Sequence, residues 1–412
     1  MSRTGSLPLK DMPAIWHEAP RRWGHPLHSV CSYLAMFPPQ MASVFIRWLT
    51  DEGDGVYDPF SGRGTVALEA LLQGRTGFGS DANPLAHALT KAKVKVPSIS
   101  ALERRLNELE QQFRRAPDVC LAQVPDDISM LYSADTLRQI VFLRNELSPL
   151  GFVDPFITAL VLGMLHANHS QGGATRGFSI SMPNTFAMAP GYVRRYIKEH
   201  GLVAPNVDVF QMLRVRAQRY ELPSMTTKAG RSWLGDAEKA VPAEVAQAKP
   251  KLIFTSPPYL QVIKYGKYNW VRLWFLNYQG NEVDQGLMAS SSLSRYLAFM
   301  KKVLDQMKTA VDPEGYICLV IGDVRRDKKQ LNLADVVWTH AAEPAGWHQH
   351  ATLVDDLPEG RKVSRIWKEN SGRATKTDRL LLMSPHSGVS LPDLPEIDWS
   401  ITPDFSSLAM EE

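Results

Sequence analysis

Short apolar runs alternate with amphipathic stretches near the N-terminus of the chain. Residues 40–50 have the spacing of a helix, and the short apolar run 55–57 is typical of a buried strand. A glycine-containing turn follows, then a helical pattern over 66–72 and a second apolar run over 76–80. Strand, glycine turn, helix and strand in this order predict a βαβ unit of the doubly wound type.

The same alternation returns in the C-terminal part, from residue 232 onwards. The pattern there predicts strands at 251–255 and 316–323 and helices at 268–277 and 293–310. Two late apolar runs, 350–354 and 379–384, predict an antiparallel hairpin that closes the sheet. The expected fold class is therefore α/β, a doubly wound Rossmann-like sheet with a late antiparallel hairpin.

The segment between these two parts, residues 96–231, follows a different pattern. It contains a charged helical stretch at 100–116, an apolar helix at 155–167 and a basic helical stretch that begins near Arg194. We interpret it as a largely helical insertion into one α/β domain. The expected organisation has four segments, which are 1–95, 96–231, 232–385 and a tail at 386–412.

The composition changes this picture little. With 412 residues, 44% hydrophobic and 22% charged, the chain has the composition of a soluble globular protein. No apolar run approaches 18 residues and the N-terminus lacks an apolar leader, so we expect a cytoplasmic protein without a membrane partner. The cysteines Cys31, Cys120 and Cys318 lack paired spacing, so we expect no metal site and three buried apolar side chains rather than nucleophiles.

The most informative polar stretch is Ser-Pro-Pro-Tyr at 256–259, directly after an apolar run. Proline cannot extend a sheet ladder, so the double proline of Pro257 and Pro258 predicts a rigid loop after a buried strand. It also removes two backbone donors, which leaves carbonyls to accept hydrogen bonds from a ligand. Together with the Ser256 hydroxyl and the Tyr259 ring, such a loop suits a planar ring that bears an exocyclic amine. An ordinary turn after a core strand remains the alternative for this stretch alone.

A second constellation is the turn Asp-Pro-Phe-Ser-Gly-Arg-Gly-Thr at 58–65. Its glycines, Gly62 and Gly64, allow positive φ and close approach of a ligand, and the following helix offers free N–H groups. Asp81 follows at the end of the next strand, where an acid can accept both hydroxyls of a ribose. This pairing predicts a nucleoside-bearing cofactor. A dinucleotide is the rival ligand, but Ala67 replaces the third glycine of that motif and Asp58 would repel a diphosphate.

The motifs at 58–65 and 256–259 together resemble those of the DNA amino-methyltransferases, which methylate cytosine N4 or adenine N6 with S-adenosylmethionine. Residues 28–39 resemble the segment that covers the methionine end of the cofactor, 81–84 the ribose motif and 235–237 the adenine motif. The resemblance spans roughly residues 25–95 and 232–385. The cofactor contacts that it implies are Met36, Phe37, Pro38, Asp58, Phe60, Gly62, Gly64, Thr65, Asp81, Asn83, Asp236 and Ala237.

The resemblance also implies a direct reaction, in which the amine attacks the sulfonium methyl group without a covalent enzyme intermediate. Ser256 Oγ and the Pro257 carbonyl then accept the two N–H groups, and Tyr259 stacks on the extruded base. A serine in the first position is, in this family, more often associated with cytosine N4 than with adenine N6. We expect a site-specific DNA methyltransferase that favours cytosine N4. The alternatives are adenine N6, an RNA amine, or a nucleic-acid-binding protein without catalysis.

Several residues outside the motifs are expected to contact double-stranded DNA. Tyr265 and Asn269 follow the Ser-Pro-Pro-Tyr loop at i,i+4 spacing and are expected to line the target pocket. The 96–231 insertion is expected to help clamp the duplex and read its sequence. The arginines expected to contact phosphates are Arg194, Arg214, Arg216, Arg325 and Arg326. The family resemblance further implies either a restriction system with a cognate endonuclease or an orphan enzyme.

Overall fold

The computed structural model describes residues 10–11, 19, 24–34, 36–115, 119–166, 177–182, 188–220, 230–258, 260, 264–326, 329–356 and 374–396. At 10–11, 325–326, 329, 356 and 374–376 it describes the backbone alone. The predicted stacking residue Tyr259 therefore lies outside the described residues, as do the side chains of Arg325 and Arg326.

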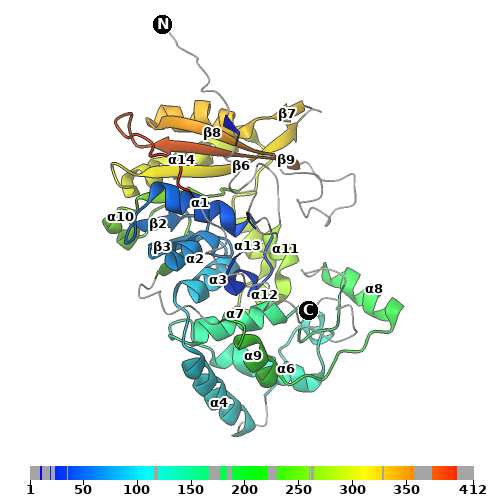
Figure 1. Cartoon of the computed structure of the whole chain (residues 1–412). Helices are drawn as coiled ribbons and strands as arrows, with labels where there is room; N and C mark the ends of the chain where they lie inside the picture. The colour runs from blue at the N-terminus through cyan, green and yellow to red at the C-terminus, as the bar shows by residue number, and fades with distance from the viewer. Residues whose placement is uncertain are drawn as a thin grey trace.

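One mixed sheet forms the upper part of the molecule (Figure 1). Its strands run in the order β1-β8-β9-β6-β5-β2-β3-β4, and β7 pairs with β6. They are β1 (Lys10–Asp11), β2 (Gly55–Asp58), β3 (Thr76–Asp81), β4 (Arg231–Leu234), β5 (Leu252–Thr255), β6 (Tyr316–Arg326), β7 (Lys329–Leu331), β8 (His348–Asp356) and β9 (Ala374–Ser384).

The sheet confirms the predicted fold class. Strands β4, β3, β2, β5 and β6 are mutually parallel, and the predicted late hairpin is present because β9 runs antiparallel to both β6 and β8. The central strand β5 is buried along its whole length. That agrees with its continuous apolar sequence, because parallel strands are covered by helices on both faces.

Helices cover both faces of the sheet. On one face lie α1 (Pro39–Leu49) and α2 (Thr65–Leu72), with Phe45 and Val66 packed against Phe254 of β5. On the other face lie α14 (Leu293–Ala310) and α15 (Leu333–Val337), where Met300 and Leu333 belong to the same core as Ile253. The smaller elements are η2 (Pro26–Ser29), α10 (Ala243–Ala248), η3 (Trp338–Ala342) and η4 (Glu343–Ala345).

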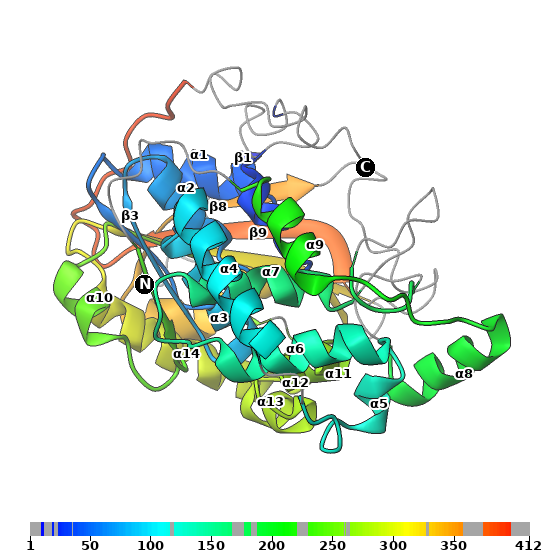
Figure 2. The same cartoon turned by 90° about the horizontal axis from the view of Figure 1, so that it is seen from below.

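The described part of the insertion is mainly helical, as predicted, and lies below the sheet (Figures 1 and 2). Its core includes Leu106, Phe142, Leu160 and Leu213, and it is continuous with Leu89 of the α/β domain. The helices are α3 (Pro84–Val94) of the α/β domain and α4 (Ile99–Arg115), α5 (Asp126–Ser129), α6 (Ala134–Glu146), α7 (Asp154–Met164), α8 (Pro190–His200) and α9 (Val209–Ala217) of the insertion. A further group, α11 (Tyr265–Tyr268), α12 (Trp270–Phe275) and α13 (Gly280–Gly286), packs beside them.

The described residues also test the expectations drawn from composition. Cys31 and Cys318 are buried as expected, but Cys120 is exposed, so the prediction of a buried side chain was wrong there. Cys120 lies in the connection between α4 and α5, where no apolar partner covers it among the described residues. Within the described ranges, no helix has the length and apolar character to cross a membrane. No cluster of three or more metal-ligating side chains occurs in those ranges either.

Candidate cofactor and target site

The carboxyl ends of β2, β3, β4 and β5 meet at one edge of the sheet, and a cavity of about 270 Å³ opens there. Ligands of doubly wound sheets bind at this edge. The cavity joins motifs that lie far apart in the sequence. Its lining includes these predicted site residues: Phe60, Gly62, Asp81, Asn83, Asp236, Ala237, Ser256, Pro257, Pro258 and Tyr265.

The glycine turn after β2 forms one wall of the cavity. Gly62 and Gly64 have φ of +50° and +80°, a region that side chains with a Cβ rarely adopt. At Gly64 a Cβ would also lie 2.9 Å from the Thr90 Cα. Both glycines are therefore required for the sharp turn into α2, whose N-terminus begins at Thr65.

Asp81 ends β3 and lies at the centre of the site. Its two carboxylate oxygens accept hydrogen bonds from the Gly62 N–H (2.9 Å) and the Asn83 N–H (2.8 Å), so it ties the glycine turn to the start of α3. Burial raises the pKa of Asp81 to about 6, although the two backbone N–H groups act in the opposite direction. The carboxylate is held in place while it lines the cavity.

An aromatic pair stands beside this acid. Asn83 caps α3 and its Nδ2 donates to the Tyr33 hydroxyl at 3.0 Å. The Tyr33 ring stacks on Tyr265 of α11, with centroids 5.7 Å apart and an interplanar angle of 24°. Burial, and to a lesser extent the Asp81 carboxylate, raises the pKa of Tyr33, so its hydroxyl stays protonated. Tyr265 thus lines the cavity as predicted, whereas Tyr33 was not singled out from the sequence.

The loop after β4 forms the opposite wall. The Gly235 N–H donates to the Asp81 carbonyl at 3.0 Å, and the Asp236 Oδ1 accepts from the Glu238 N–H at 3.0 Å. Asp236 also lies 3.5 Å from the Lys239 Nζ, and its side chain is partly exposed at the cavity. The Asp236 carboxylate therefore lines the cavity together with the glycine turn.

The third wall is the loop after β5. The Ser256 hydroxyl donates to the Val320 carbonyl of β6 at 3.1 Å, which fixes the side chain against the neighbouring strand. Pro257 is buried and Pro258 is partly buried. The residue before the loop, Thr255, donates from its hydroxyl to Asp58 Oδ1 at 2.6 Å. Asp58 is buried and does not line the cavity, and burial raises its pKa to about 7.

Some predicted cofactor residues lie away from the cavity. Met36 is 47% exposed, Phe37 packs edge-on against Phe254, and Pro38 immediately precedes α1. Thr65 is buried at the start of α2, where it accepts a hydrogen bond from Arg63. None of these four residues is among the described residues that line the cavity.

A buried basic group supports the glycine turn from behind. The Lys93 side chain is 1% exposed, and its ammonium donates to the Arg63 carbonyl at 2.6 Å. The Arg63 guanidinium donates to the His28 carbonyl at 3.0 Å, and the His28 ring lies 2.7 Å from Glu69. Burial lowers the pKa values of Lys93 and His28 and raises that of Glu69 to about 8.

Sequence reasoning missed several lining residues. Glu238 comes from the loop after β4, Leu287 and Met288 from the connection between α13 and α14, and Phe299 from α14. Phe299 approaches Phe60 with centroids 6.0 Å apart. The motifs at 28–39, 58–65 and 81–84 could have indicated Tyr33, Pro59 and Ala82, which also line the cavity. The others approach through tertiary packing alone.

The predicted DNA contacts are mostly engaged within the protein. Asn269 is buried, and its amide donates to the Tyr265 carbonyl at 2.9 Å and accepts from Arg272 at 2.8 Å. Arg214 pairs with Glu110 of α4, and Arg194 pairs with Asp127 at 2.6 Å. The remaining arginine with a described side chain is Arg216, which donates to the Ser29 carbonyl at 3.2 Å.

Comparison with known proteins matches the N-terminal part of the chain to one family. Residues 10–92 match the N6_N4_Mtase family, described as DNA methylase. The type II methyltransferase M.MvaI of Kocuria varians is 22% identical over 262 residues, which is 59% of this chain and 56% of that protein. The type II methyltransferase M.MjaII of Methanocaldococcus jannaschii is 26% identical over 83 residues, 20% of this chain and 16% of that protein. The chain thus spans about half the length, or less, of these curated relatives.

Solved structures give weaker likenesses. The rRNA methyltransferase aviRa of Streptomyces viridochromogenes has a TM-score of 0.34 at 12% identity, covering 88% of this chain and 91% of that chain. The putative DNA modification methylase TTHA0409 of Thermus thermophilus, complexed with S-adenosyl-L-methionine, has a TM-score of 0.22 at 20% identity, covering 39% and 54%. Scores this low do not indicate a shared function.

The mostly parallel sheet, with a cavity at the carboxyl ends of its strands, defines an α/β protein of the doubly wound class. Within that class, residues 10–92 are similar to the N6/N4 DNA methylases, and the chain is distantly homologous to type II methyltransferases. The predicted resemblance is confirmed. Members of this family take their methyl group from S-adenosylmethionine, so the match also supports the predicted cofactor.

Proposed function

We propose that this protein transfers a methyl group from S-adenosylmethionine to the exocyclic amine of an extruded base in double-stranded DNA, with cytosine N4 as the favoured target in a specific sequence. The observation that carries this proposal is the convergence of Asp81, Asp236 and Ser256 on one cavity. The acids suit the polar groups of a nucleoside, and the serine loop suits an amine. The activity, its substrate and its target base are all part of the proposal, because the alignments cover only part of the length of each relative.

The residues of the cavity fit the cofactor. The Asp81 carboxylate is positioned by two backbone N–H groups and is placed to accept the ribose hydroxyls. Asp236 would accept from the adenine amine, and Gly62 lets the backbone approach the ligand closely. When bound, S-adenosylmethionine supplies an electrophilic methyl group.

The chain's own contribution is to position the amine. Ser256 donates its hydroxyl hydrogen to the Val320 carbonyl, which fixes the oxygen against β6, and this oxygen is the first acceptor of an amine N–H in the proposal. The Pro257 carbonyl is the second acceptor in the proposal. Two such bonds orient the nitrogen lone pair and increase its electron density, as preorganised polar groups do.

The base itself requires a flat, water-excluding surface. Tyr33 and Tyr265 present aromatic rings at the cavity, and Tyr259 is proposed to stack on the base. The serine in the first position of the loop favours cytosine N4, and adenine N6 is the second candidate. An RNA amine is less favoured, because the family match is to DNA methylases.

The cellular setting is proposed with support from the relatives named as type II methyltransferases. We propose a role in a restriction–modification system in the cytoplasm, with a cognate endonuclease as partner. We also propose that residues 1–95 and 232–385 form one catalytic domain and that the 96–231 insertion contacts DNA. The tail is proposed to lie on the surface, and in its described part Ser390 accepts from the Tyr316 hydroxyl at 2.7 Å.

The experiment that tests the proposal supplies labelled S-adenosylmethionine with duplex DNA, tRNA or rRNA and then identifies the labelled nucleoside. We expect label in N4-methylcytosine from DNA. Label in N6-methyladenine would retain the enzyme class and change the base. Label confined to RNA, or absent from all three substrates, would overturn the proposal.

A further inference from the structure

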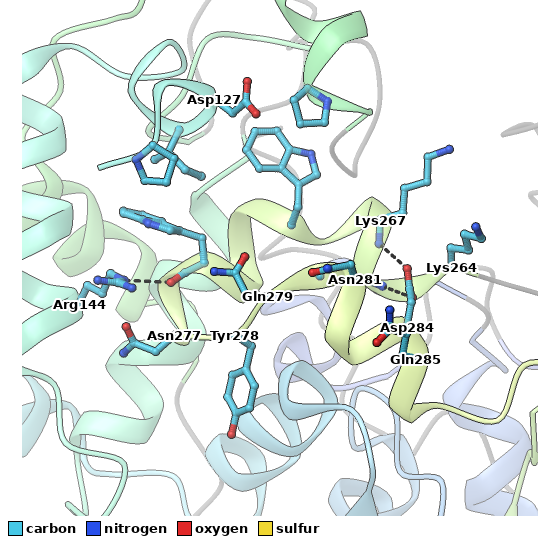
Figure 3. A pocket seen from close by; sticks show the side chains of 17 residues that line it. Asp127, Arg144, Lys264, Lys267, Asn277, Tyr278, Gln279, Asn281, Asp284 and Gln285 are labelled. Carbon is cyan, nitrogen blue, oxygen red and sulfur yellow. Dashed lines mark hydrogen bonds between the residues drawn. The ribbon is translucent and has the colours of Figure 1, made fainter. Parts of the chain in front are cut away.

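Figure 3 shows a second and larger cavity, of about 710 Å³, which lies beside the candidate site. It is formed by α11, α12 and α13 on one side and by residues of α5, α6 and α8 on the other. The two cavities share a wall. Tyr265 and Gly286 line the catalytic cavity, whereas their neighbours Lys264 and Gln285 line the second one. A polymer that places one unit in the first cavity can therefore extend into the second.

Positive charge predominates in this second cavity. Lys264 and Lys267 are exposed, and neither has an ion-pair partner among the residues that the structure describes. In Figure 3 they lie on the opposite side of the cavity from Arg144. Of the two acids in the lining, Asp127 is paired with a cation, whereas Asp284 is held by backbone N–H groups and keeps its charge. Asp284 accepts from the N–H groups of Gly266 and Lys267 at 2.7 Å and 3.0 Å, and Asp127 pairs with Arg194.

The remaining lining has the chemistry of nucleobase contacts. The aromatic rings of Trp270, Trp274 and Tyr278 offer stacking surfaces. Exposed amides belong to Asn277, Gln279, Asn281 and Gln285. Asparagine and glutamine side chains pair with base edges through two hydrogen bonds, and unpaired lysines bind phosphates. An acidic peptide would account for the lysines but not for this row of amides.

We propose that this cavity is the cleft that docks the DNA next to the extruded base. Lys264 and Lys267 contact backbone phosphates, and the amides of Gln279 and Asn281 meet base edges. The inference rests on the proposed function and adds Lys264 and Lys267 to the arginines predicted from the sequence. Those of α8 and α9 are already bonded within the protein, with Arg194 and Arg214 in ion pairs, so they have less charge to offer.

The test uses the full chain with the double substitution K264Q/K267Q. Binding of a fluorescent DNA duplex is measured over a series of salt concentrations. Each phosphate contact contributes about 0.9 to the slope of log affinity against log salt, so we expect the slope to decrease by about 2. The charge-matched control is K249Q/K301Q, which removes two exposed cations outside the insertion, one at the end of α10 and one in α14, and should leave the slope unchanged. An unchanged slope in K264Q/K267Q would overturn the proposal that this cavity docks DNA.

A second measurement examines base contacts. The substitutions Q279A and N281A should broaden the set of sequences methylated in plasmid DNA, with a loss of discrimination of about 5- to 150-fold at the affected base pair. Affinity for S-adenosylmethionine is measured in every variant and should stay at the wild-type value. If the wild type methylates DNA and K264Q/K267Q keeps the wild-type salt slope, only the proposal that this cavity docks DNA is refuted. Wild-type protein that neither binds nor methylates DNA refutes the proposed function and the cleft with it.

Discussion

The Thr255 hydroxyl donates a hydrogen bond of 2.6 Å to Asp58, and these two residues stand at the entrances of the two functional loops. Asp58 opens the glycine turn after β2, and Thr255 is the last residue before the Ser-Pro-Pro loop after β5. The same oxygen of Asp58 accepts from the Phe60 N–H at 3.0 Å. A single buried carboxyl group therefore sets the position of one loop relative to the other.

Replacing Thr255 with valine should destabilise the protein. The substitution T255V keeps the shape of the side chain but leaves the buried Asp58 oxygen with one fewer donor, at a cost of about 1–3 kcal/mol. Urea unfolding measures the change in the free energy of unfolding. T255S keeps the hydroxyl and serves as the control. Equal stability of T255V and T255S would show that the hydrogen bond contributes nothing.

The buried Asp58 should also make stability depend on pH. Burial raises its pKa from 3.8 to about 7. Between about pH 4 and pH 7, therefore, Asp58 is protonated in the folded state and ionised in the unfolded state. Its contribution to stability is therefore complete below about pH 4 and is lost as the pH rises to about 7, by at most about 4 kcal/mol. Urea unfolding of the wild type and D58N across this range isolates the effect, because Glu69 and Asp81 titrate in both proteins. A difference in the free energy of unfolding between wild type and D58N that does not change with pH would contradict this prediction.

Asp81 should confer pH dependence on cofactor affinity. Its pKa is raised to about 6, and the ionised form is the better acceptor for ribose hydroxyls. We expect the dissociation constant for S-adenosylmethionine, measured by calorimetry, to increase as the pH falls below about 6. D81N should bind about 10- to 100-fold more weakly and lose this dependence. The control is E238Q, which alters another acid of the cavity, one that pairs with Lys302 at 2.6 Å.

Ser256 should affect methyl transfer rather than cofactor binding. S256A removes one of the two proposed acceptors of the target amine, and loss of one such preorganised group costs about 10²-fold in kcat. The dissociation constant for S-adenosylmethionine should stay at the wild-type value. Single-turnover transfer to DNA separates the chemical step from product release. Wild-type transfer by S256A would exclude Ser256 from the positioning role.

The sequence predicted the parts of the site that are fixed by local geometry. Gly62 and Gly64 mark a turn that needs positive φ, and Asp81 ends the next strand of the same βαβ unit. Parallel pairing of β2 with β5 then brings Ser256 to the same edge of the sheet. These relationships follow from chain order and from the handedness of the fold, so they could be predicted without a structure.

Contacts between distant segments could not be predicted from the sequence. Asn269 has the expected i,i+4 relation to Tyr265, because its backbone N–H and its Nδ2 both donate to the Tyr265 carbonyl. Its Oδ1 accepts from the buried guanidinium of Arg272, and Asn269 is not among the described residues that line the cavity. The ion pair of Arg214 with Glu110 joins residues 104 positions apart, which no local pattern reveals.

The crossing of α11 and α13 should be intolerant of any side chain. A Cβ added to Gly266 would lie 1.8 Å from the Gly280 carbonyl oxygen, so G266A must separate the two helices. We expect a loss of about 1–3 kcal/mol in the free energy of unfolding, because overpacking forces backbone shifts. DNA affinity and methyl transfer should both decrease, since α11 carries Tyr265 at one cavity and Lys267 at the other. G191A in α8 is the control, because a Cβ there meets no described atom within 4 Å. If G266A matched G191A in stability, DNA affinity and activity, the close helix crossing would be irrelevant to both cavities.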